Sequence, residues 1–520
     1  MQRFRGVDRG DGTAGAFDFQ ATNRKRFPLV CRPFNGRVLI MDFDSLSIPG
    51  MAQAIASGKT TSRQLVAFYL GRIAENNQRI NAIVQQPEVA QLLEQADEAD
   101  RRVAAKLALG PLHGVPITIK DVCHVEGFKM SCGMPEWHGP ASVSDATVVQ
   151  RLRQAGALIL GITNVPELCM SFETENFLYG RTRNPFDLSR TPGGSSGGEA
   201  AAIAAGCSPG GLGSDAGGSL RIPAHFNGIC GLKLTQGRVP LTGQYPVERA
   251  GLIHMTSAYG VMGRYVDDIK TLGYLIAGSD GHDPDTVDVP FGDDLAIGQL
   301  RVAMFHELPG VAVRPSVLDA MHKVAGLLEP VVRSVSQACP EGMELACDSL
   351  WNIFLSGGDA GRAWDKFLPG LGRDQLSPCL EGLVQASRAT ELSVDQFKGD
   401  LAYINTFRRG LSGFFRKHDV LICPVFPDVA FKPGESLDGR ARYSYVFPFS
   451  LSGSPAVVLP VGFDPDLGLP IGIQIVGPHW KEERLLALAK VLESRLAGWQ
   501  RAIPDEEPAD HEDHACMSRA

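Results

Sequence analysis

The stretch that decides the fold is TPGGSSGGEAAAIAAGCSPGGLGSDAGGSLRIP, residues 191–223. Two loops rich in Gly and Ser flank an Ala-rich segment at 199–205, which is predicted to form a tightly packed helix. Small side chains let one backbone approach another, and Gly adopts dihedral angles that other residues resist. We therefore expect a buried helix flanked by two loops that can approach a ligand closely.

The rest of the chain has the composition of an ordinary folded protein. Of its 520 residues, 44% are hydrophobic and 21% are charged, which excludes disorder for most of the chain. A formal charge of −8 gives no global attraction to nucleic acid or to an anionic membrane. No apolar run reaches the roughly 18 residues that a membrane helix needs. The 11 cysteines are dispersed without a Cys-x-x-Cys pair, which favours reduced thiols in a cytoplasmic protein.

Apolar patterns of helical and strand type alternate outside this stretch. Helical spacing predicts helices over residues 61–73, 88–109, 144–154 and 481–496. Apolar runs of strand type predict strands over residues 115–120, 158–162, 455–461 and 471–476. The alternation predicts an α/β fold, in which α-helices cover both faces of a β-sheet.

The chain has no fixed-period repeat and no clear linker, so we expect one large domain over residues 41–500. Residues 1–40 carry eight Arg or Lys residues against three Asp residues, and they are interpreted as a flexible basic leader or as a mis-assigned start before Met41. Residues 501–520 are acidic and are predicted to form a flexible tail. His511 and His514 in this tail could bind a metal ion, but a metal site needs rigid support, so no metal is expected.

Three kinds of chemistry are candidates for the Gly-rich stretch, and the first is phosphate binding. Gly217 stands one residue too far from Gly211 and Gly213 to complete a G-x-G-x-x-G loop. The chain also lacks a G-x-x-x-x-G-K-[ST] motif. Nucleotide binding is therefore disfavoured.

The second candidate is the nucleophile elbow of an α/β-hydrolase-type esterase. Residues 193–197 match G-x-S-x-G, with Ser195 as the nucleophile. The elbow requires a strand just before it, whereas residues 184–192 have the composition of a loop. It also requires a downstream histidine, such as His225 or His479.

The third candidate combines serine hydroxyls with a lysine. Backbone N–H groups of residues 216–219 can converge on one point and form an oxyanion hole beside Ser219. A serine hydroxyl needs a base, and a lysine can serve if burial lowers its pKa. Lys120, at the end of an apolar strand, is the best candidate, although taken alone it would be interpreted as a solvated charge at a strand edge.

The sequence resembles the amidase signature family of Ser-Ser-Lys hydrolases. The resemblance rests on GGSSGGEAAAIAAG at 193–206 and GLGSDAGGSLRIPAHFNGICGLKLTQGRVP at 211–240. Other segments that agree in order are LHGVPITIKD (112–121), GITNVPEL (161–168), Asn184-Pro185, GSPAVVLPVG (453–462) and GLPIGIQIVG (468–477). The match covers about residues 45 to 495, and it implies a large mixed twisted β-sheet covered by α-helices on both faces.

The resemblance implies a role for each residue of the motif. Ser219 would be the nucleophile that accepts the acyl group, and Ser195, after a cis peptide bond, would bridge it to the general base Lys120. Main-chain amides implied to bind the oxyanion are those of Ala216, Gly217, Gly218 and Ser219. Residues implied to contact the substrate or support the triad are Cys169, Ser171 and Ser196. Asp215 and Arg221 flank the nucleophile, and we expect them to form a supporting ion pair, because buried unpaired charges are costly.

The family includes general and aryl amidases, fatty-acid amide hydrolases and the glutamine-hydrolysing subunit of a tRNA-dependent amidotransferase. Residues 350–420 are rich in Trp, Phe and Leu and do not resemble that subunit. We therefore expect a stand-alone amidase that acts on an apolar acyl or aryl amide, with esters and carbamates as further substrates; the amidotransferase subunit is the alternative. Aromatic residues that could line an apolar pocket, although most are expected in the core, are Trp351, Phe354, Trp364, Phe367, Phe414, Phe447 and Phe449.

The expected partner is a small-molecule amide, without a cofactor, a nucleic acid or a membrane. The sequence is compatible with a homodimer. A non-catalytic binding protein that uses the same cleft is disfavoured, because Lys120, Ser195 and Ser219 are all present.

Overall fold

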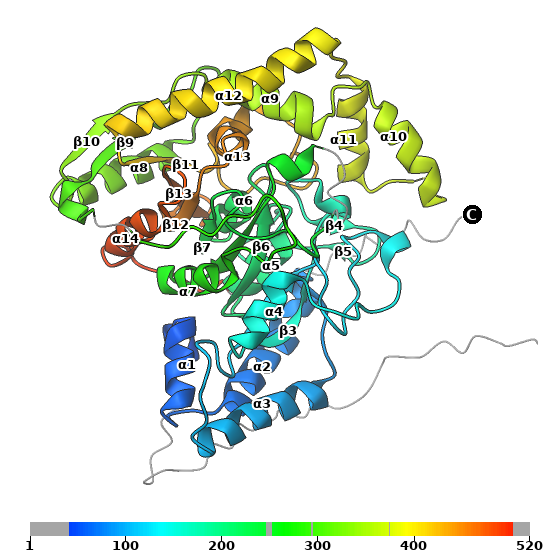
Figure 1. Ribbon diagram of the computed structural model, residues 1–520, viewed down its shortest axis with the longest axis vertical. Coiled ribbons are helices and arrows are strands. Elements are labelled where there is room, and N and C mark those ends of the chain that lie inside the picture. Colours follow the sequence, from blue (N-terminus) through cyan, green and yellow to red (C-terminus); the bar gives the residue numbers. More distant parts are fainter. Residues whose placement is uncertain (1–40, 246–251, 293–294, 374, 503–520) are drawn as a thin grey trace, which may run out of the picture. The chain divides into compact units, whose positions relative to one another are not determined.

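The computed structural model describes residues 41–245, 252–292, 295–373 and 375–502 (Figure 1). The described residues from Phe43 onward belong to one compact unit. The predicted basic leader, nearly all of the predicted acidic tail, and His511 and His514 lie outside the described residues.

The unit is built on a mixed sheet of eleven strands. In spatial order the strands are β1 (Ile83–Gln85), β3 (Leu158–Thr163), β2 (Pro116–Lys120), β6 (Gly210–Asp215), β8 (Ala258–Gly263), β7 (Cys230–Lys233), β12 (Ala456–Phe463), β13 (Pro470–Val476), β11 (Val420–Pro424), β9 (Arg301–Met304) and β10 (Ser334–Gln337). The parallel neighbours are β2 with β3 and β6, and β9 with β10 and β11; the other neighbours are antiparallel. A separate two-stranded sheet pairs β4 (Glu175–Asn176) with β5 (Gly180–Arg181).

Helices cover both faces of this sheet, as the sequence predicts. The α-helices are α1 (Ile48–Ala56), α2 (Ser62–Ile80), α3 (Val89–Ala104), α4 (Thr147–Gln154), α5 (Gly197–Ala204), α6 (Arg221–Phe226), α7 (Val266–Ile276), α8 (Pro315–Leu328), α9 (Met343–Leu350), α10 (Arg362–Phe367), α11 (Pro378–Arg388), α12 (Val394–Lys417), α13 (Phe447–Leu451) and α14 (Glu482–Glu493). On β7, a Cβ at Gly231 would lie 3.2 Å from Ala224 of α6, whereas Leu232 Cδ2 would lie 2.8 Å from a Cβ placed on Gly273 of α7. Successive strand residues point to opposite faces, so α6 and α7 lie on opposite sides of the sheet.

The predicted helices and strands are confirmed, with ends that differ by a few residues. α2 begins after Thr61, whose hydroxyl accepts the Gln64 N–H while the Gln64 side chain accepts the Thr61 N–H, a capping box. α3 ends at Ala104 instead of extending to residue 109. Lys106 there has a φ of 55°, and the Leu107 N–H bonds back to Arg102 O at 3.1 Å, which closes the helix before the Gly-Pro stop.

The prediction of a loop directly after the Ala-rich helix is wrong for residues 210–215, which form the central strand β6. The glycines of β6 allow its backbone to pack closely against β2, because a Cβ on Gly211 would clash with the Thr118 carbonyl oxygen of β2. Strand β6 therefore lies directly beside β2, and the residues that follow it come close to the end of β2, where Lys120 lies.

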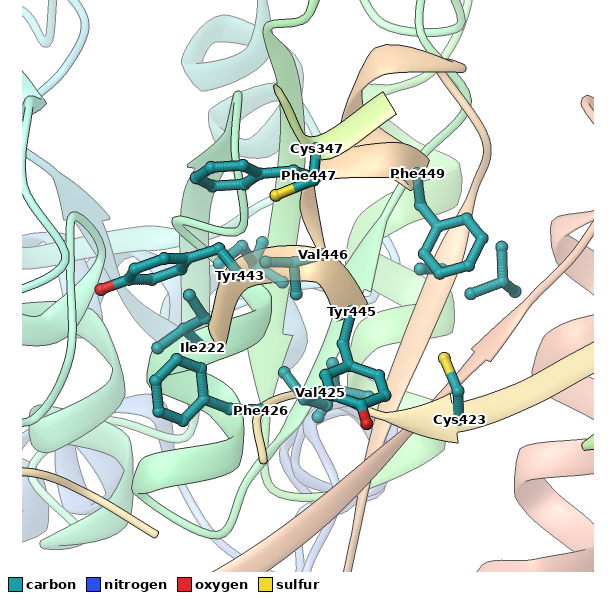
Figure 2. Packing of buried hydrophobic residues seen from close by; sticks show 14 of the residues in the cluster. Ile222, Cys347, Cys423, Val425, Phe426, Tyr443, Tyr445, Val446, Phe447 and Phe449 are labelled. Atoms are coloured by element: carbon teal, nitrogen blue, oxygen red, sulfur yellow. The ribbon is translucent and has the colours of Figure 1, made fainter. Parts of the chain in front are cut away.

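The loop after β6 rests on a buried hydrophobic cluster that includes Tyr443, Val446 and Phe447 (Figure 2). The rings of Tyr443 and Phe447 stack with centroids 5.2 Å apart. Gly218 has a φ of 111°, and a Cβ on it would lie 2.9 Å from Val446 Cγ2. Glycine is thus required at position 218 both by the backbone conformation and by the close approach of the core.

No helix in the described part of the chain is long and apolar enough to cross a membrane.

Candidate active site

Lys120 lies at the end of β2 with its side chain fully buried. Its Nζ lies 2.7 Å from Ser195 Oγ, 2.8 Å from Ser214 Oγ and 2.9 Å from Ser196 Oγ. Hydroxyls thus surround the amine, and the interpretation of Lys120 as a solvated charge at a strand edge is wrong. The reason is tertiary: β6 and the loop before α5 cover the end of β2.

The surroundings of Lys120 favour the uncharged amine. Burial lowers the pKa of Lys120 below its ordinary value, against weaker opposing effects of Cys169 and Asp215. The Ser196 hydroxyl lies 3.2 Å from the Ser214 carbonyl oxygen and can donate its proton there, so its oxygen accepts from Lys120. A neutral amine has two N–H donors and one lone pair, which leaves the lone pair for the hydroxyl of Ser195 or Ser214.

Ser195 and Ser219 line the same cavity. The peptide bond between Gly194 and Ser195 is cis, as the resemblance implies. The Ser196 N–H donates to the Ser219 carbonyl oxygen at 2.9 Å and joins the two loops. No hydrogen bond links Ser195 Oγ and Ser219 Oγ within the described residues, so the structure brings Lys120 and Ser195 into direct contact and Ser219 to the cavity beside them.

Backbone N–H groups of the loop after β6 are available for an oxyanion. Within the described ranges, the N–H groups of Ala216, Gly217 and Ser219 have no hydrogen-bond partner, and these three residues line the cavity. The expectation for Gly218 is wrong: its N–H donates to Asp215 Oδ1 at 2.7 Å. Asp215 closes the turn by accepting this bond, and only three of the four implied donors therefore remain free.

The expected ion pair between Asp215 and Arg221 is present, and both side chains are fully buried. Arg221 Nε and Nη2 donate to the two oxygens of Asp215 at 3.0 Å each. Burial alone would raise the pKa of Asp215, but the charge and hydrogen bonds of Arg221, together with the charge of Lys233 and the bond from Gly218 N–H, outweigh it and hold this pKa below its usual range. Arg221 also donates to Val446 O, Gln474 and Ser450, so the pair ties the loop to α13 and β13.

Cys169 and Ser171 lie on the cavity wall. The Ser171 Oγ accepts the Glu173 N–H at 3.1 Å, and no hydrogen bond joins it to the triad in the described structure. The Cys169 thiol lies 3.9 Å from Asp121 O. Both residues therefore contact the space that a substrate would fill, and the support of Lys120 comes from Ser196 and Ser214.

Ser214 is the residue of this site that sequence reasoning missed. It is 8% exposed, lines the cavity and contacts Lys120 directly. It belongs to β6, which was not predicted as a strand. Its position next to Asp215 in the motif was the available signal.

The cavity has a volume of about 520 Å³ and a mostly apolar wall. Four of the seven candidate aromatics, Trp351, Phe354, Trp364 and Phe367, line it. Phe447 and Phe449 belong to the core, and Phe414 packs against that core. Among the described lining residues, Asp359 is the only charged one and none is a cation.

The elbow of an α/β-hydrolase does not fit this geometry. Residues 188–196 contain no strand, and α5 begins at Gly197. Both ring nitrogens of His225 are engaged with the backbone of Gly472 and Asp428. His479 contacts Ser452 O, so neither histidine is paired with Ser195.

Comparisons with known proteins agree with this geometry. The family model described as Amidase matches residues 64–486. The A subunit of glutamyl-tRNA(Gln) amidotransferase from Acidothermus cellulolyticus is 33% identical over 479 residues, which are 85% of this chain and 93% of that protein. The solved structure of 6-aminohexanoate cyclic dimer hydrolase with substrate is 27% identical, with a TM-score of 0.74 over 88% of this chain and 98% of that one. A chain from a vestigial complex related to the origins of an s-triazine catabolic enzyme is 29% identical, with a TM-score of 0.77 over 88% and 100%.

The fold and the buried lysine with its serines thus define a hydrolase of C–N amide bonds. The chain belongs to the amidase family, whose characteristic site is a Ser-Ser-Lys triad.

Proposed function

We propose that the chain hydrolyses the amide of an apolar carboxylic acid through an acyl-enzyme on Ser219. The observation that carries the proposal is the fully buried Lys120, with its Nζ 2.7 Å from Ser195 Oγ at the wall of an apolar cavity. Because burial lowers the pKa of this lysine, its amine can accept a proton at a lower pH than an ordinary lysine would need.

In the acylation step, Ser219 Oγ attacks the amide carbon and forms a C–O bond. The Ser219 proton passes to Ser195 Oγ as the proton of Ser195 passes to Lys120 Nζ. The N–H groups of Ala216, Gly217 and Ser219 hold the oxyanion. The C–N bond then breaks, and the leaving nitrogen takes a proton from Ser195, which Lys120 replaces.

Deacylation runs the same relay with water. Water forms the new C–O bond, its proton passes through Ser195 to Lys120, and the ester bond to Ser219 breaks. Ser219 regains a proton, and the carboxylic acid leaves. The relay requires Ser195 and Ser219 to come within hydrogen-bond reach once substrate fills the cavity, because catalytic hydrogen bonds often tighten only in the substrate complex.

The wall of the cavity supports an apolar acyl or aryl group as the substrate. Trp351, Phe354, Trp364 and Phe367 contribute apolar surface to it. Free glutamine carries a carboxylate and an ammonium group, and both need polar or charged partners when they leave water. The described wall offers Asp359 to the ammonium and no cation to the carboxylate.

The second candidate is the glutamine-hydrolysing role in a tRNA-dependent amidotransferase. It is favoured by a specific observation, the 32–33% identity to amidotransferase A subunits over 85–88% of this chain in several bacteria. In that case the chain would act together with partner subunits, and its glutaminase activity would depend on them.

One experiment separates the two candidates. The purified chain is assayed alone against L-glutamine and against p-nitroanilides of acids from acetate to octanoate and phenylacetate. Turnover of the apolar anilides, without release of ammonia from glutamine, supports the first candidate. No anilide turnover by the chain alone, together with glutamine hydrolysis that appears only after the partner subunits of an amidotransferase are added, supports the second.

The nucleophile is tested in the same preparation. A fluorophosphonate probe should label one serine, which peptide mass spectrometry should locate at Ser219. The Ser219→Ala variant should lose both labelling and turnover. Unchanged labelling or turnover in that variant would reject the assignment.

A further inference from the structure

Glu199 is a buried acid that the proposed reaction does not use. It lies in the first turn of α5 and is fully buried. Its Oε1 lies 2.6 Å from Thr118 Oγ1, and its Oε2 lies 2.9 Å from Thr163 Oγ1. None of the ion pairs in the described structure involves it.

The two threonines place Glu199 directly behind Lys120. Thr118 precedes Lys120 by two residues on β2, and Thr163 of β3 pairs with Lys120 in the sheet register. Glu199 therefore connects the two strands whose ends hold the lysine. Lys120 is also the ionisable group whose charge acts on Glu199.

The hydrogen bonds around Glu199 form a chain of four oxygen–oxygen contacts. Two are the contacts of Glu199 with Thr118 and Thr163. Thr118 Oγ1 also lies 2.9 Å from Ser208 Oγ, and Ser208 Oγ lies 3.0 Å from the Gly210 carbonyl oxygen. All of these side chains are fully buried.

A count of protons decides the state of the carboxyl group. Each of the four contacts needs one proton, and the hydroxyls of Thr118, Thr163 and Ser208 supply three. The Gly210 carbonyl oxygen can only accept, so Ser208 must donate to it. Thr118 must then donate to Ser208, which leaves the contact between Glu199 and Thr118 without a proton unless the carboxyl group supplies it.

We propose that Glu199 is held as a neutral carboxylic acid that donates to Thr118 and keeps negative charge away from Lys120. An anion at this position would stabilise the ammonium form of Lys120 and oppose its use as a base. Glu199 is thus a positioning residue for the proposed base. Burial raises the pKa of Glu199 to about 7, which agrees with this state below neutral pH.

The protonation state is tested directly by infrared spectroscopy of the full chain at pH 5.5. Wild-type protein should show the C=O stretch of a protonated carboxylic acid, and this band should be missing from Glu199→Gln. A spectrum without that difference would overturn the proposal. This measurement does not depend on any substrate, so it remains decisive even if the proposed amidase activity is not found.

The consequence for Lys120 rests on the proposed function and is tested by the pH profile of kcat/KM. If Glu199 is neutral, Glu199→Gln should leave the acidic limb of the profile in place, because no charge is removed from beside Lys120. A shift of that limb to lower pH by one unit or more would show that an anion had been raising the pKa of Lys120. That shift would contradict the proposal.

Stability gives a third readout with a defined sign. A carboxyl group whose pKa is higher in the folded state stabilises the fold fully below about pH 4.5, and this contribution is lost as pH rises through about 7. The Tm of Glu199→Gln minus the Tm of wild type should therefore increase by ~1–3 °C as the pH is raised from 5 to 8. A Tm of Glu199→Gln that falls relative to that of wild type as pH rises would show that the fold stabilises a carboxylate at this position, and it would contradict the proposal.

Discussion

At the scale of single residues, the proposed reaction depends on a lysine whose pKa is lowered by burial. Two buried lysines invite comparison, because burial lowers the pKa of both Lys120 and Lys233, the latter to about 7. Lys120 contacts three serine hydroxyls at the cavity. Lys233 donates to the Ser454 carbonyl oxygen, away from those serines. Their difference in role therefore comes from their neighbours.

The first prediction concerns the pH dependence of amide turnover. Because burial lowers the pKa of Lys120, its amine should stay neutral to a lower pH than an ordinary lysine, and kcat/KM should fall as pH drops through that pKa. Lys120→Met should reduce kcat/KM by ~10²–10⁴-fold and remove the acidic limb. The measurement is kcat/KM from pH 5 to 10 with an apolar anilide.

Lys233→Met is the matched control for this prediction, since it also removes a buried lysine whose pKa is lowered by burial. It should keep the acidic limb. If Lys233→Met shifts the acidic limb and Lys120→Met leaves it unchanged, Lys120 is not the base.

At the scale of elements, strand β6, the loop after it and helix α6 form one unit that presents Ser219. The glycines of β6 allow contact with β2, and Asp215 closes the loop by accepting from Gly218 N–H and from Arg221. The same bond removes one of the four expected oxyanion donors. Closure of the loop and presentation of the remaining amides are therefore coupled through one carboxylate.

The second prediction concerns this carboxylate. Asp215→Asn should lower the free energy of unfolding by ~3–5 kcal/mol, because it leaves the Arg221 guanidinium buried without its counter-charge. Urea unfolding followed by tryptophan fluorescence measures the loss. It should be accompanied by a fall in kcat, because the loop that carries Ser219 loses its closure.

Asp365→Asn provides the comparison, since Asp365 pairs with Arg388 and both side chains are more than half exposed, at 57% and 52%. Its effect on the free energy of unfolding should stay within ~0.5 kcal/mol. Equal decreases in the free energy of unfolding of the two variants would show that the buried ion pair stabilises the fold no more than the exposed one.

At the scale of the whole described unit, the cavity is assembled from segments far apart in sequence. Its wall combines residues after β3, residues after β6, and residues of the helical segment α10–α11. That segment contributes Trp364, Phe367 and Leu383 to the wall. It is tied to the residues after β3 by Arg373, whose Nη1 lies 2.7 Å from the buried Glu167.

The third prediction concerns this tie. Arg373→Ala removes the cation beside Glu167, whose carboxylate also accepts from Ser377. The helical segment should then be held less firmly, and KM for an apolar anilide should rise by roughly tenfold with a smaller change in kcat, because the segment shapes the cavity and does not touch the reacting atoms. Steady-state kinetics measure the two constants separately.

Arg362→Ala is the control within the same segment, because Arg362 pairs with Glu391 at the exposed surface, where 61% and 64% of the two side chains are accessible. It should leave KM unchanged. A fall in kcat without a rise in KM in Arg373→Ala would contradict a role in shaping the cavity.

Local patterns in the sequence were sufficient to predict the helices and strands and to propose which residues carry the reaction. Short-range spacing predicts α2, β2 and β13 because each depends on neighbours within a few positions. The ordered motifs likewise identified Lys120, Ser195 and Ser219, since their types and spacing are carried by the sequence itself. The Gly-rich strand β6 was missed because its stability comes from close packing against β2 and β8, and not from the propensity of its residues.

By itself, the sequence determined the membership of the family and the alternation of helices and strands, and it was sufficient to propose the three residues of the triad. Only the tertiary structure decided the lowered pKa of Lys120, the hydrogen bond from Gly218 to Asp215, the contact of Ser214 with Lys120 and the aromatic residues of the cavity, and it is the basis for the proton proposed on Glu199. The physical reason is that pKa values, free N–H groups and cavity walls depend on burial and on partners from distant parts of the chain. The distances between these partners are set by tertiary packing, and the spacing of residues along the sequence does not specify them.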